Sequence, residues 1–505
     1  MIRQRYVALL GLASGLDYAA QVLVPVLLVR VLSANDFGGY RLLWLAAQTS
    51  ANILSVSIAP ILVTLVPQQA RHRRGALFGN AFGYLALAAV VTALLLSPLT
   101  PLAQRMFAGG TVNAWLLPLF AGFWMVSLPF DQVALACNRP ADQALLSLGQ
   151  AALRVGLVVI AAILLRNLDG VGIALITLAV ARTMMALIYA SRLSRVDGGR
   201  GLSLDTGLAR LQLRYGLGFG VGFTLFTLRG QTDGWVAAFR FDPVAVATQG
   251  VAMAAIPLIS ILRMAVTNVI APEIAADVSA GRVDAALNSN RRGNLMVAAL
   301  LFPLCGMLLA LAYPLLTLAF TARFANAVLP FRIYVSGMLA MALESMTLVL
   351  ALGATAFARR QAAVTLFLAV AACYLGSSIT DDGAFGLCGI AIGATTVGWI
   401  SQIWNLVYVR RALKLGWSEF QAWSEMLALI LVNLGATLFT MAVMLLVPTH
   451  WPMLLQLIAG SVAYFAAALI PSLAWPRVRN IYSDMLDVAH AKRGPKPTLT
   501  SKPAS

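Results

Sequence analysis

Eight ionisable residues lie inside long apolar stretches of this sequence, where a charge is costly. They are Asp17, Asp131, Arg154, Arg182, Arg229, Asp233, Arg263 and Glu344. If these stretches cross a membrane, each central charge costs about 2.5–3.5 kcal/mol on insertion scales. Four of the residues are basic and four are acidic, so they can pair with one another or face a ligand. In either case the set predicts a polar interior.

Arginine is the only cation inside these stretches, because they contain no lysine. Its planar guanidinium suits bidentate binding of phosphate and stays charged when partly desolvated. We therefore predict that the four arginines bind the anionic part of a substrate, with Arg229 as the central contact helped by Arg154, Arg182 and Arg263. The four acidic residues, Asp17, Asp131, Asp233 and Glu344, are predicted to bind a coupling ion or to form ion pairs. No residue favours a proton over a sodium ion.

Arg229 and Asp233 are four residues apart. On one continuous helix, residues at this spacing share a face and can neutralise each other. The spacing predicts that Asp233 holds the Arg229 guanidinium when no substrate is bound.

Signatures of enzyme chemistry are scarce. The three histidines, at positions 72, 450 and 490, lie outside the apolar stretches, and the four cysteines have no C-x-x-C spacing. Metalloprotease, phosphate-loop and nucleophile-elbow motifs are absent. The glycines at 216, 218, 220 and 222 resemble a phosphate loop, but they lie within an apolar stretch, which favours close helix packing or a bend. We expect no enzyme activity, no metal and no cofactor.

The elements that position these residues must be membrane helices. Hydrophobic residues make up 60% of the 505 residues and charged residues 11%, against about 25% charged residues in soluble domains. One span needs about 20 mostly apolar residues, and uniformly apolar runs of this length exclude barrel strands. The sequence predicts an all-α polytopic membrane protein of about fourteen spans, at residues 6–31, 41–66, 75–99, 112–136, 142–165, 169–193, 209–238, 244–271, 293–320, 328–356, 361–380, 384–409, 423–447 and 453–475.

The net charge of +17 reflects topology rather than nucleic-acid binding. Arginine-rich connections alternate along the chain with connections that hold mostly single arginines, such as Arg105, Arg166, Arg240 and Arg323, or the acidic pair Asp381 and Asp382. Cytoplasmic connections carry the excess of arginine and lysine. This alternation predicts that both termini are cytoplasmic.

The polar connection 194–208 separates two sets of six predicted spans that resemble each other. Arg5-Tyr6 corresponds to Arg214-Tyr215, and Pro67 to Pro272. Parallel repeats of this kind are typical of transporters, whose substrate site lies at the repeat interface. We predict six-helix bundles at 1–200 and 201–415 around a central cavity, two additional spans at 416–475, and a basic cytoplasmic tail at 476–505 that attracts membrane lipid.

Three segments resemble the Wzx-type polysaccharide flippases, which belong to a superfamily with multidrug extruders and peptidoglycan-precursor flippases. The first, residues 29–43, contains Phe37-Gly38 and Tyr40 between the first two spans. The second combines Asp233 with residues 246–252 and Pro272, although the usual Gly-x-Tyr is replaced. The third is the glycine-rich segment 386–391.

This resemblance implies flipping of a polyprenyl-diphosphate-linked oligosaccharide across the bacterial inner membrane, for exopolysaccharide or O-antigen synthesis, by alternating access. It also implies a polysaccharide polymerase and its assembly machinery as partners. A drug or small-solute antiporter of the same superfamily is the first alternative, disfavoured by the four arginines. A membrane glycosyltransferase or polymerase is the second, disfavoured by the short outer connections. A peptidoglycan-precursor flippase is disfavoured because the first span has Asp17 without the arginine usual there.

Overall fold

The computed structural model describes residues 2–101, 104, 113–196, 198–199, 201–379, 383–448 and 450–491. For residues 2–14, 18, 219, 384 and 484–491 only the backbone is described. Arg105, Asp381, Asp382 and the tail after Ala491, on which the predicted topology partly rests, lie outside the described residues.

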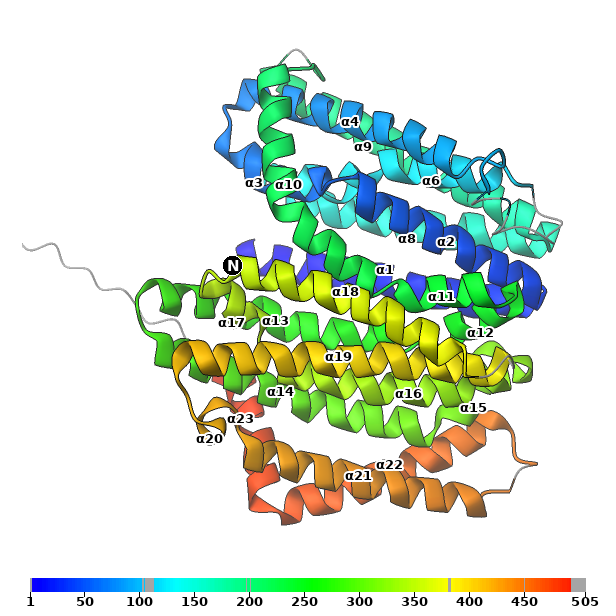
Figure 1. The fold of residues 1–505 in the computed structure, drawn as a ribbon, viewed down its shortest axis with the longest axis vertical. Coiled ribbons are helices and arrows are strands. Elements are labelled where there is room, and N and C mark those ends of the chain that lie inside the picture. Colours follow the sequence, from blue (N-terminus) through cyan, green and yellow to red (C-terminus); the bar gives the residue numbers. More distant parts are fainter. Residues whose placement is uncertain are drawn as a thin grey trace, which may run out of the picture. The chain divides into compact units, whose positions relative to one another are not determined.

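Every regular element in the described part of the chain is a helix, which confirms the predicted all-α class (Figure 1). The first half contains α1 (Ile2–Val31), α2 (Ala34–Leu54), α3 (Ile58–Gln68), η1 (Arg71–Arg73), α4 (Arg74–Leu95), α6 (Leu116–Val126), η2 (Leu128–Asp131), α7 (Val133–Ala136), α8 (Pro140–Leu165), α9 (Leu168–Val196), α10 (Thr206–Arg229) and α11 (Thr232–Arg240). The second half contains α12 (Pro243–Ala252), α13 (Ile256–Ser279), α14 (Val283–Ala310), α15 (Ala312–Phe320), η3 (Ala322–Ala327), α16 (Val328–Met338), η4 (Leu339–Leu343), α17 (Met346–Ala351), α18 (Thr355–Ser377), α19 (Gly383–Leu413), α20 (Trp417–Phe420), α21 (Trp423–Leu446), α22 (Met453–Ala474) and α23 (Pro476–Ala491).

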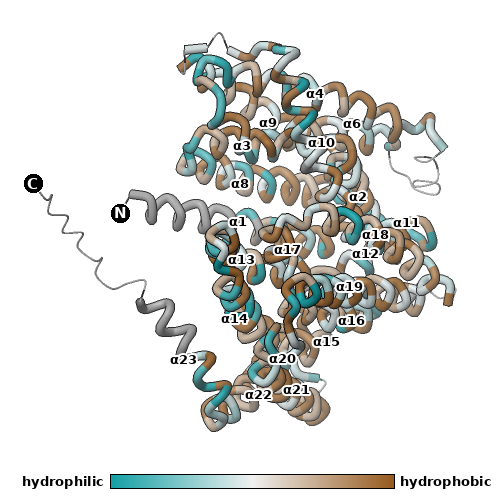
Figure 2. The backbone as a smooth tube through the Cα atoms, turned by 60° about the vertical axis from the view of Figure 1, so that its left-hand side comes forward, coloured by the Kyte–Doolittle hydropathy of each residue, from teal (hydrophilic) through white to brown (hydrophobic). Residues whose placement is uncertain are grey.

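The protein is a polytopic membrane protein. Among the described residues, 11 helices are long and apolar enough to cross a membrane, or 12 if the bent pair α2–α3 counts as one span. Each of these overlaps a predicted span, although the helix Val283–Ala310 begins and ends ten residues before the predicted span 293–320. The predicted spans 6–31 and 209–238 correspond to α1 and to α10 with α11, and do not enter this count. Figure 2 shows apolar residues along most of the length of the helices.

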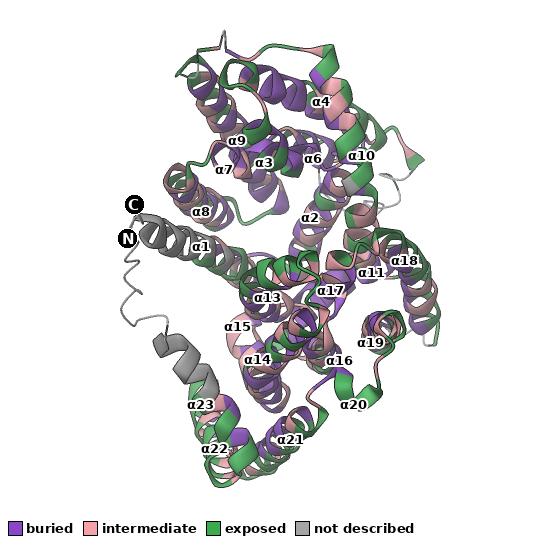
Figure 3. Ribbon diagram, turned by 90° about the vertical axis from the view of Figure 1, so that its left-hand side faces the viewer, coloured by how far each residue is buried: buried purple, intermediate pink, exposed green. Residues whose placement is uncertain are grey.

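The chain forms two compact units. The first comprises Met1–Pro257, Leu316–Tyr334 and Thr355–Val397, and the second comprises Leu258–Leu315, Val335–Ala354 and Gly398–Ser505. The units are defined by which helices contact one another, and their boundaries differ from those of the predicted repeat. The predicted division at residue 200 therefore stays a prediction. Figure 3 shows buried faces on α4, α6 and α9 of the first unit and on α14 and α21 of the second.

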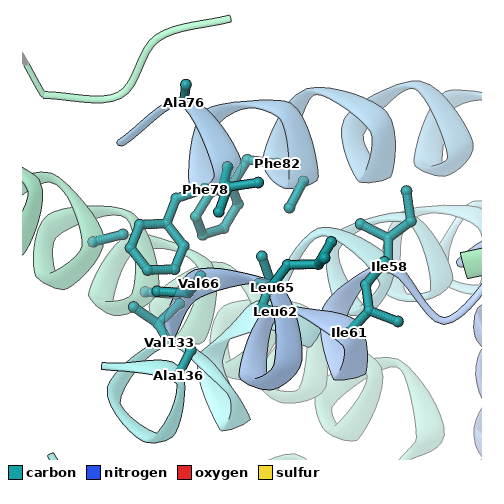
Figure 4. Packing of buried hydrophobic residues seen from close by; sticks show 14 of the residues in the cluster. Ile58, Ile61, Leu62, Leu65, Val66, Ala76, Phe78, Phe82, Val133 and Ala136 are labelled. Atoms are coloured by element: carbon teal, nitrogen blue, oxygen red, sulfur yellow. The ribbon is translucent and has the colours of Figure 1, made fainter. Parts of the chain in front are cut away.

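The second predicted span is broken in the first unit, where α2 and α3 meet at an angle of 45°. Val56 and Ser57 at the break adopt left-handed φ values of 47° and 55°, which are unusual for a β-branched residue such as Val56. α3 is fixed by apolar packing: its Ile58, Leu62 and Val66 lie in a buried cluster with side chains of α4 and α7 (Figure 4). The buried cluster therefore fixes the orientation of α3 beyond the break.

Two of the four glycines of α10, Gly216 and Gly220, pack closely against this break, as the sequence predicts. A Cβ atom added to Gly216 would lie 2.6 Å from the carbonyl oxygen of Val56, and one added to Gly220 would lie 3.0 Å from the Ser57 hydroxyl. α10 is unbroken from Thr206 to Arg229. The glycines on this face therefore allow close packing and do not mark a break in the helix. A side chain at Gly216 would displace the break.

The polar connection before α10 is fastened to the start of α4. Asp205 caps α10, because its Oδ1 accepts a hydrogen bond from Leu208 N at 3.0 Å, and its Oδ2 pairs with Arg73 at 3.0 Å. Asn80 binds the Asp205 backbone on both sides, donating to its carbonyl oxygen and accepting from its amide. The hydrogen bonds that Leu208 N and Arg73 donate to the Asp205 carboxylate lower its pKa, and the bond from Leu208 N contributes most.

Candidate functional site

A polar cavity of about 350 Å³ lies within the first unit. Residues of α1, α2, α6, α8, α11, α12 and the start of α13 line it, together with the link between α10 and α11. Its polar side chains are those of Gln21, Tyr40, Arg41, Trp44, Gln48, Trp124, Arg154, Gln231, Asp233 and Gln249. A cavity that combines charged, amide and aromatic side chains is suited to a polar ligand with an anionic group.

Arg41 lies two turns inside α2, which begins after Ser33, whose hydroxyl accepts a hydrogen bond from Asp36 N. Its guanidinium packs directly on Gly250 of α12, where an added Cβ atom would lie 2.4 Å from Arg41 Nε. Within the described residues the Arg41 side chain has no hydrogen bond and no ion pair; its charge interacts at longer range with Asp233. The guanidinium therefore retains its full capacity to bind a ligand.

Arg154 of α8 is buried, with 8% of its side chain exposed. Its nearest carboxylate is Asp17 of α1, where Nη1 and Oδ1 are 3.5 Å apart, and its guanidinium lies 5.8 Å from the Trp44 ring centroid. Its Nε atom has no hydrogen-bond partner among the described residues, which is equally true of Arg182 and Arg263. The difference lies in the ion pair: a separation of 3.5 Å is long for a charge-assisted hydrogen bond, so Arg154 is less completely paired than an arginine with a close carboxylate.

Asp233 is 5% exposed and anchors a hydrogen-bond network at the edge of the cavity. Its Oδ2 accepts a hydrogen bond from Tyr334 Oη at 3.0 Å, and its Oδ1 accepts one from Gly234 N at 2.8 Å. Gln249 donates in turn to Tyr334 Oη. Asp233 is therefore held by neutral donors, with Arg41 as its nearby cation.

The predicted pairing of Arg229 with Asp233 is wrong. α10 ends at Arg229 and α11 begins at Thr232, so the two residues lie on different helices and the i, i+4 geometry does not apply. The Arg229 guanidinium instead lies 5.0 Å from the Phe226 ring centroid. Arg229 does not line the cavity, although its neighbours Gly230 and Gln231 do.

The other two predicted arginines have close carboxylate partners. Arg182 is paired with Asp131 at 2.7 Å and stacks on Trp124 and Phe130, with centroid distances of 4.5 and 4.9 Å. In the second unit Arg263 pairs with Glu344, and its Nη1 donates to Asn294 Oδ1 at 2.9 Å. Of the eight predicted residues, Arg154 and Asp233 line the cavity.

The sequence prediction missed Arg41 and the glutamines as site residues. Arg41 lies at the edge of its predicted span, so it was indistinguishable from an arginine at a helix end. Glutamine carries no charge to mark it against an apolar background. The nearest sequence signal is the succession of Phe37, Gly38, Tyr40 and Arg41, which belongs to the segment 29–43 that carries the family resemblance.

Comparisons with solved structures identify the architecture. A structure of the lipid II flippase MurJ in an inward closed conformation matches with a TM-score of 0.67 at 12% identity, covering 92% of this chain and 99% of that one. The chain has the fold of the MOP superfamily of transporters. An inward-facing multidrug resistance MATE transporter of that superfamily matches with a TM-score of 0.57 at 14% identity, covering 79% and 96% of the two chains.

A MOP superfamily transporter from Pyrococcus furiosus, described as having a binding pocket of reverse polarity, matches with a TM-score of 0.51 at 15% identity, covering 81% of this chain and 96% of that one. These structures are of transporters, not enzymes. No family model matches the sequence. No curated protein matches it either. At such low identities the likeness establishes the fold and leaves the substrate open.

Proposed function

We propose that this protein is a flippase that moves a polyprenyl-diphosphate-linked oligosaccharide across the bacterial inner membrane for exopolysaccharide or O-antigen synthesis. The observation that carries this proposal is the state of the two cavity arginines. Arg41 has no direct partner among the described residues and Arg154 has only a long contact with Asp17. Two incompletely paired guanidinium groups at one cavity suit a diphosphate, which offers several charged oxygen acceptors.

The remaining lining suits a glycan. Gln21, Gln48, Gln231 and Gln249 carry amides, which donate to and accept from sugar hydroxyls. Trp44 and Trp124 add aromatic surface to the same cavity. A protein of this fold is named a lipid II flippase, so the fold accommodates a lipid-linked substrate. Alternating access between the two membrane sides is the proposed mechanism.

A cation or drug antiporter is the second candidate, and one observation favours it: the buried carboxylate of Asp233 lies in the same cavity. Asp233 is, however, flanked by Arg41 and already accepts two hydrogen bonds. A cationic drug would meet two arginines there. The charge of the cavity therefore favours an anionic substrate.

We also propose that both termini are cytoplasmic and that the protein works beside a polysaccharide polymerase and its assembly machinery. Arg229, Arg182 and Arg263 remain candidate substrate contacts, as do Asp17, Asp131 and Glu344 for ion coupling. Because Arg182 and Arg263 are tightly paired, Arg41 and Arg154 become the leading contacts for the diphosphate.

The test is reconstitution of the protein in liposomes that contain a polyprenyl-diphosphate oligosaccharide, with the accessibility of the sugar measured from each side. We expect the glycan to become accessible on the opposite side, and this transport to fall in Arg41→Ala. Lipid II and a cationic dye serve as competing substrates in parallel liposomes. Transport of the dye without the glycan supports the antiporter, and transport of lipid II alone contradicts the glycan assignment.

A further inference from the structure

One amide atom in the lining of the polar cavity is left without a hydrogen bond. Gln249 of α12 lines this cavity and is 2% exposed. Its Oε1 atom is buried and has no hydrogen-bond partner among the described residues. A buried acceptor without a partner costs free energy. A ligand that brings a donor to this oxygen therefore gains binding energy.

The hydrogen bonds around Gln249 determine which end of its amide is free. The Tyr334 hydroxyl has a single hydrogen, which it donates to Asp233 Oδ2 at 3.0 Å. The Tyr334 oxygen can therefore only accept from Gln249, so the Nε2 end of the amide faces it. Nε2 also lies 3.8 Å from Met253 Sδ, a weak acceptor for its second hydrogen. The free end is the oxygen, which can accept a hydrogen bond but cannot donate one.

Gln231 lines the same cavity in a different state. Thr49 Oγ1 lies 2.8 Å from Gln231 Oε1 and can donate to it. The Gln231 oxygen therefore has a partner within the chain, and the Gln249 oxygen has none among the described residues. This difference makes Gln249 the more specific candidate for recognising a donor on the ligand.

The free oxygen belongs to the same corner of the cavity as Arg41, the proposed contact of the diphosphate. Gln249 directly precedes Gly250, on which the Arg41 guanidinium packs. Two successive hydrogen bonds, through Tyr334, join Gln249 to Asp233, whose nearby cation is Arg41. A ligand whose anionic group binds Arg41 should therefore place the atoms next to that group within reach of Gln249.

We infer that Gln249 recognises the sugar attached to the diphosphate, by accepting a hydrogen bond from the substituent on carbon 2 of that sugar. In an aldose diphosphate the anomeric carbon carries the phosphate, and carbon 2 is the adjacent carbon that can carry a donor. A hydroxyl O–H and an acetamido N–H both satisfy the free oxygen. Gln249 then discriminates against a first sugar that has no donor at this carbon. The inference rests on the proposed function.

The first experiment measures binding of three farnesyl-diphosphate sugars to the full-length protein in detergent by calorimetry. The sugars are glucose, N-acetylglucosamine, and a glucose in which fluorine replaces the hydroxyl on carbon 2. Fluorine is close to a hydroxyl in size but has no hydrogen to donate. We expect the fluorinated carrier to bind about tenfold more weakly than the tighter of the other two, the value of one hydrogen bond to a buried group. The tighter of those two identifies the preferred substituent.

Gln249→Met removes the acceptor and keeps a side chain of similar length. The ratio of the two affinities should fall to about one, because no hydrogen bond then distinguishes the carriers. The ratio compares ligands in a single preparation, so it does not depend on the folded fraction. Gln231→Met is the matched control: it alters the same cavity but should keep the ratio, since its oxygen already has Thr49 as a partner.

Tyr334→Phe is a second variant, which leaves the acceptor in place. It removes the oxygen that holds Gln249 Nε2, so the amide can turn its NH₂ group toward the ligand. The affinity ratio should fall below that of the parent protein. It decides the question if Gln249→Met cannot be purified. A ratio of one in the parent protein, an unchanged ratio in Gln249→Met or Tyr334→Phe, or a ratio lost in Gln231→Met overturns the inference.

The second experiment measures transport of the same three sugars on polyprenyl diphosphate in liposomes. We expect the fluorinated carrier to be transported more slowly than the preferred one. Transport of the carriers with equal binding of all three overturns the role of Gln249 and leaves the proposed function standing. Selective binding without transport of any carrier leaves Gln249 standing and contradicts the flippase. If none of the three carriers binds, both are overturned.

Discussion

The polar cavity of the first unit and the Arg263 cluster of the second unit both contain arginine and carboxylate side chains. They differ in how closely each arginine is paired with a carboxylate. Arg263 has a carboxylate partner in Glu344 and an amide partner in Asn294. Arg41 has neither within the described residues and faces a cavity. The comparison shows that a charge inside the membrane does not by itself mark a substrate site. Incomplete pairing beside a cavity is the more specific sign.

The largest expected effect is a loss of protein stability when the Arg263 cluster is disrupted. Arg263→Ala leaves the largely buried Glu344 carboxylate, 17% exposed, without its cation, and breaking a buried pair costs about 3–5 kcal/mol. We expect a clear loss of the thermal unfolding midpoint and of abundance in the membrane. The double variant Arg263→Met/Glu344→Leu should recover most of the stability, because it leaves no unpaired charge. If Arg263→Ala is as stable as the parent protein, the pair is not structural.

Arg41→Ala should show the opposite pattern. No described residue loses a hydrogen bond or an ion pair, so the unfolding midpoint should fall less than in Arg263→Ala, whereas transport should fall about ten- to hundredfold, the value of one or two charged hydrogen bonds. Arg41→Lys keeps the charge but loses the bidentate geometry, so its transport should lie between that of Arg41→Ala and that of the parent protein. Transport of the reconstituted variants, normalised to abundance, provides the measurement. Normal transport by Arg41→Ala would remove it from the substrate site.

Arg229→Ala sharpens the comparison further. Arg229 does not line the cavity, and its observed contact is a stacking interaction with Phe226. We expect transport to fall by less than about fivefold, measured beside Arg41→Ala in the same liposomes. A loss as large as that of Arg41→Ala restores Arg229 as a central diphosphate contact.

The smallest effect concerns the exposed pair of Arg73 and Asp205. Hydrogen bonds from Leu208 N and Arg73 lower the pKa of Asp205 in the folded protein. Its stabilising contribution is therefore present above the unfolded pKa of about 3.9 and is lost as the pH falls through the lower folded value. Asp205→Asn should have a slightly lower unfolding midpoint than the parent protein at pH 7, and the difference should shrink below about pH 4. A difference independent of pH contradicts the assignment.

Much of the fold follows from the sequence, because length and uniform apolarity define membrane helices without further information. The helix breaks do not follow. The break at Gly230 and Gln231 interrupts a predicted span and separates Arg229 from Asp233, and the break at Val56 and Ser57 interrupts another. The sequence predicted pairs of opposite charge, but partner choice depends on helix packing: Asp233 meets Tyr334 of a distant segment. Arg41 lines the cavity and packs on Gly250 of another helix, and no local pattern encodes this contact.

The most direct test of the central claim compares two lipid carriers in the same liposomes, one linked to the glycan through a diphosphate and one through a monophosphate. If incompletely paired arginines hold the diphosphate, the parent protein should transport the diphosphate carrier faster. Arg41→Ala should lose most of that preference. Ser50→Ala should keep it, because the Ser50 hydroxyl is on the same helix but donates to Ala46 O and does not line the cavity. A preference that is unchanged in Arg41→Ala, or that is absent from the parent protein, would contradict the account.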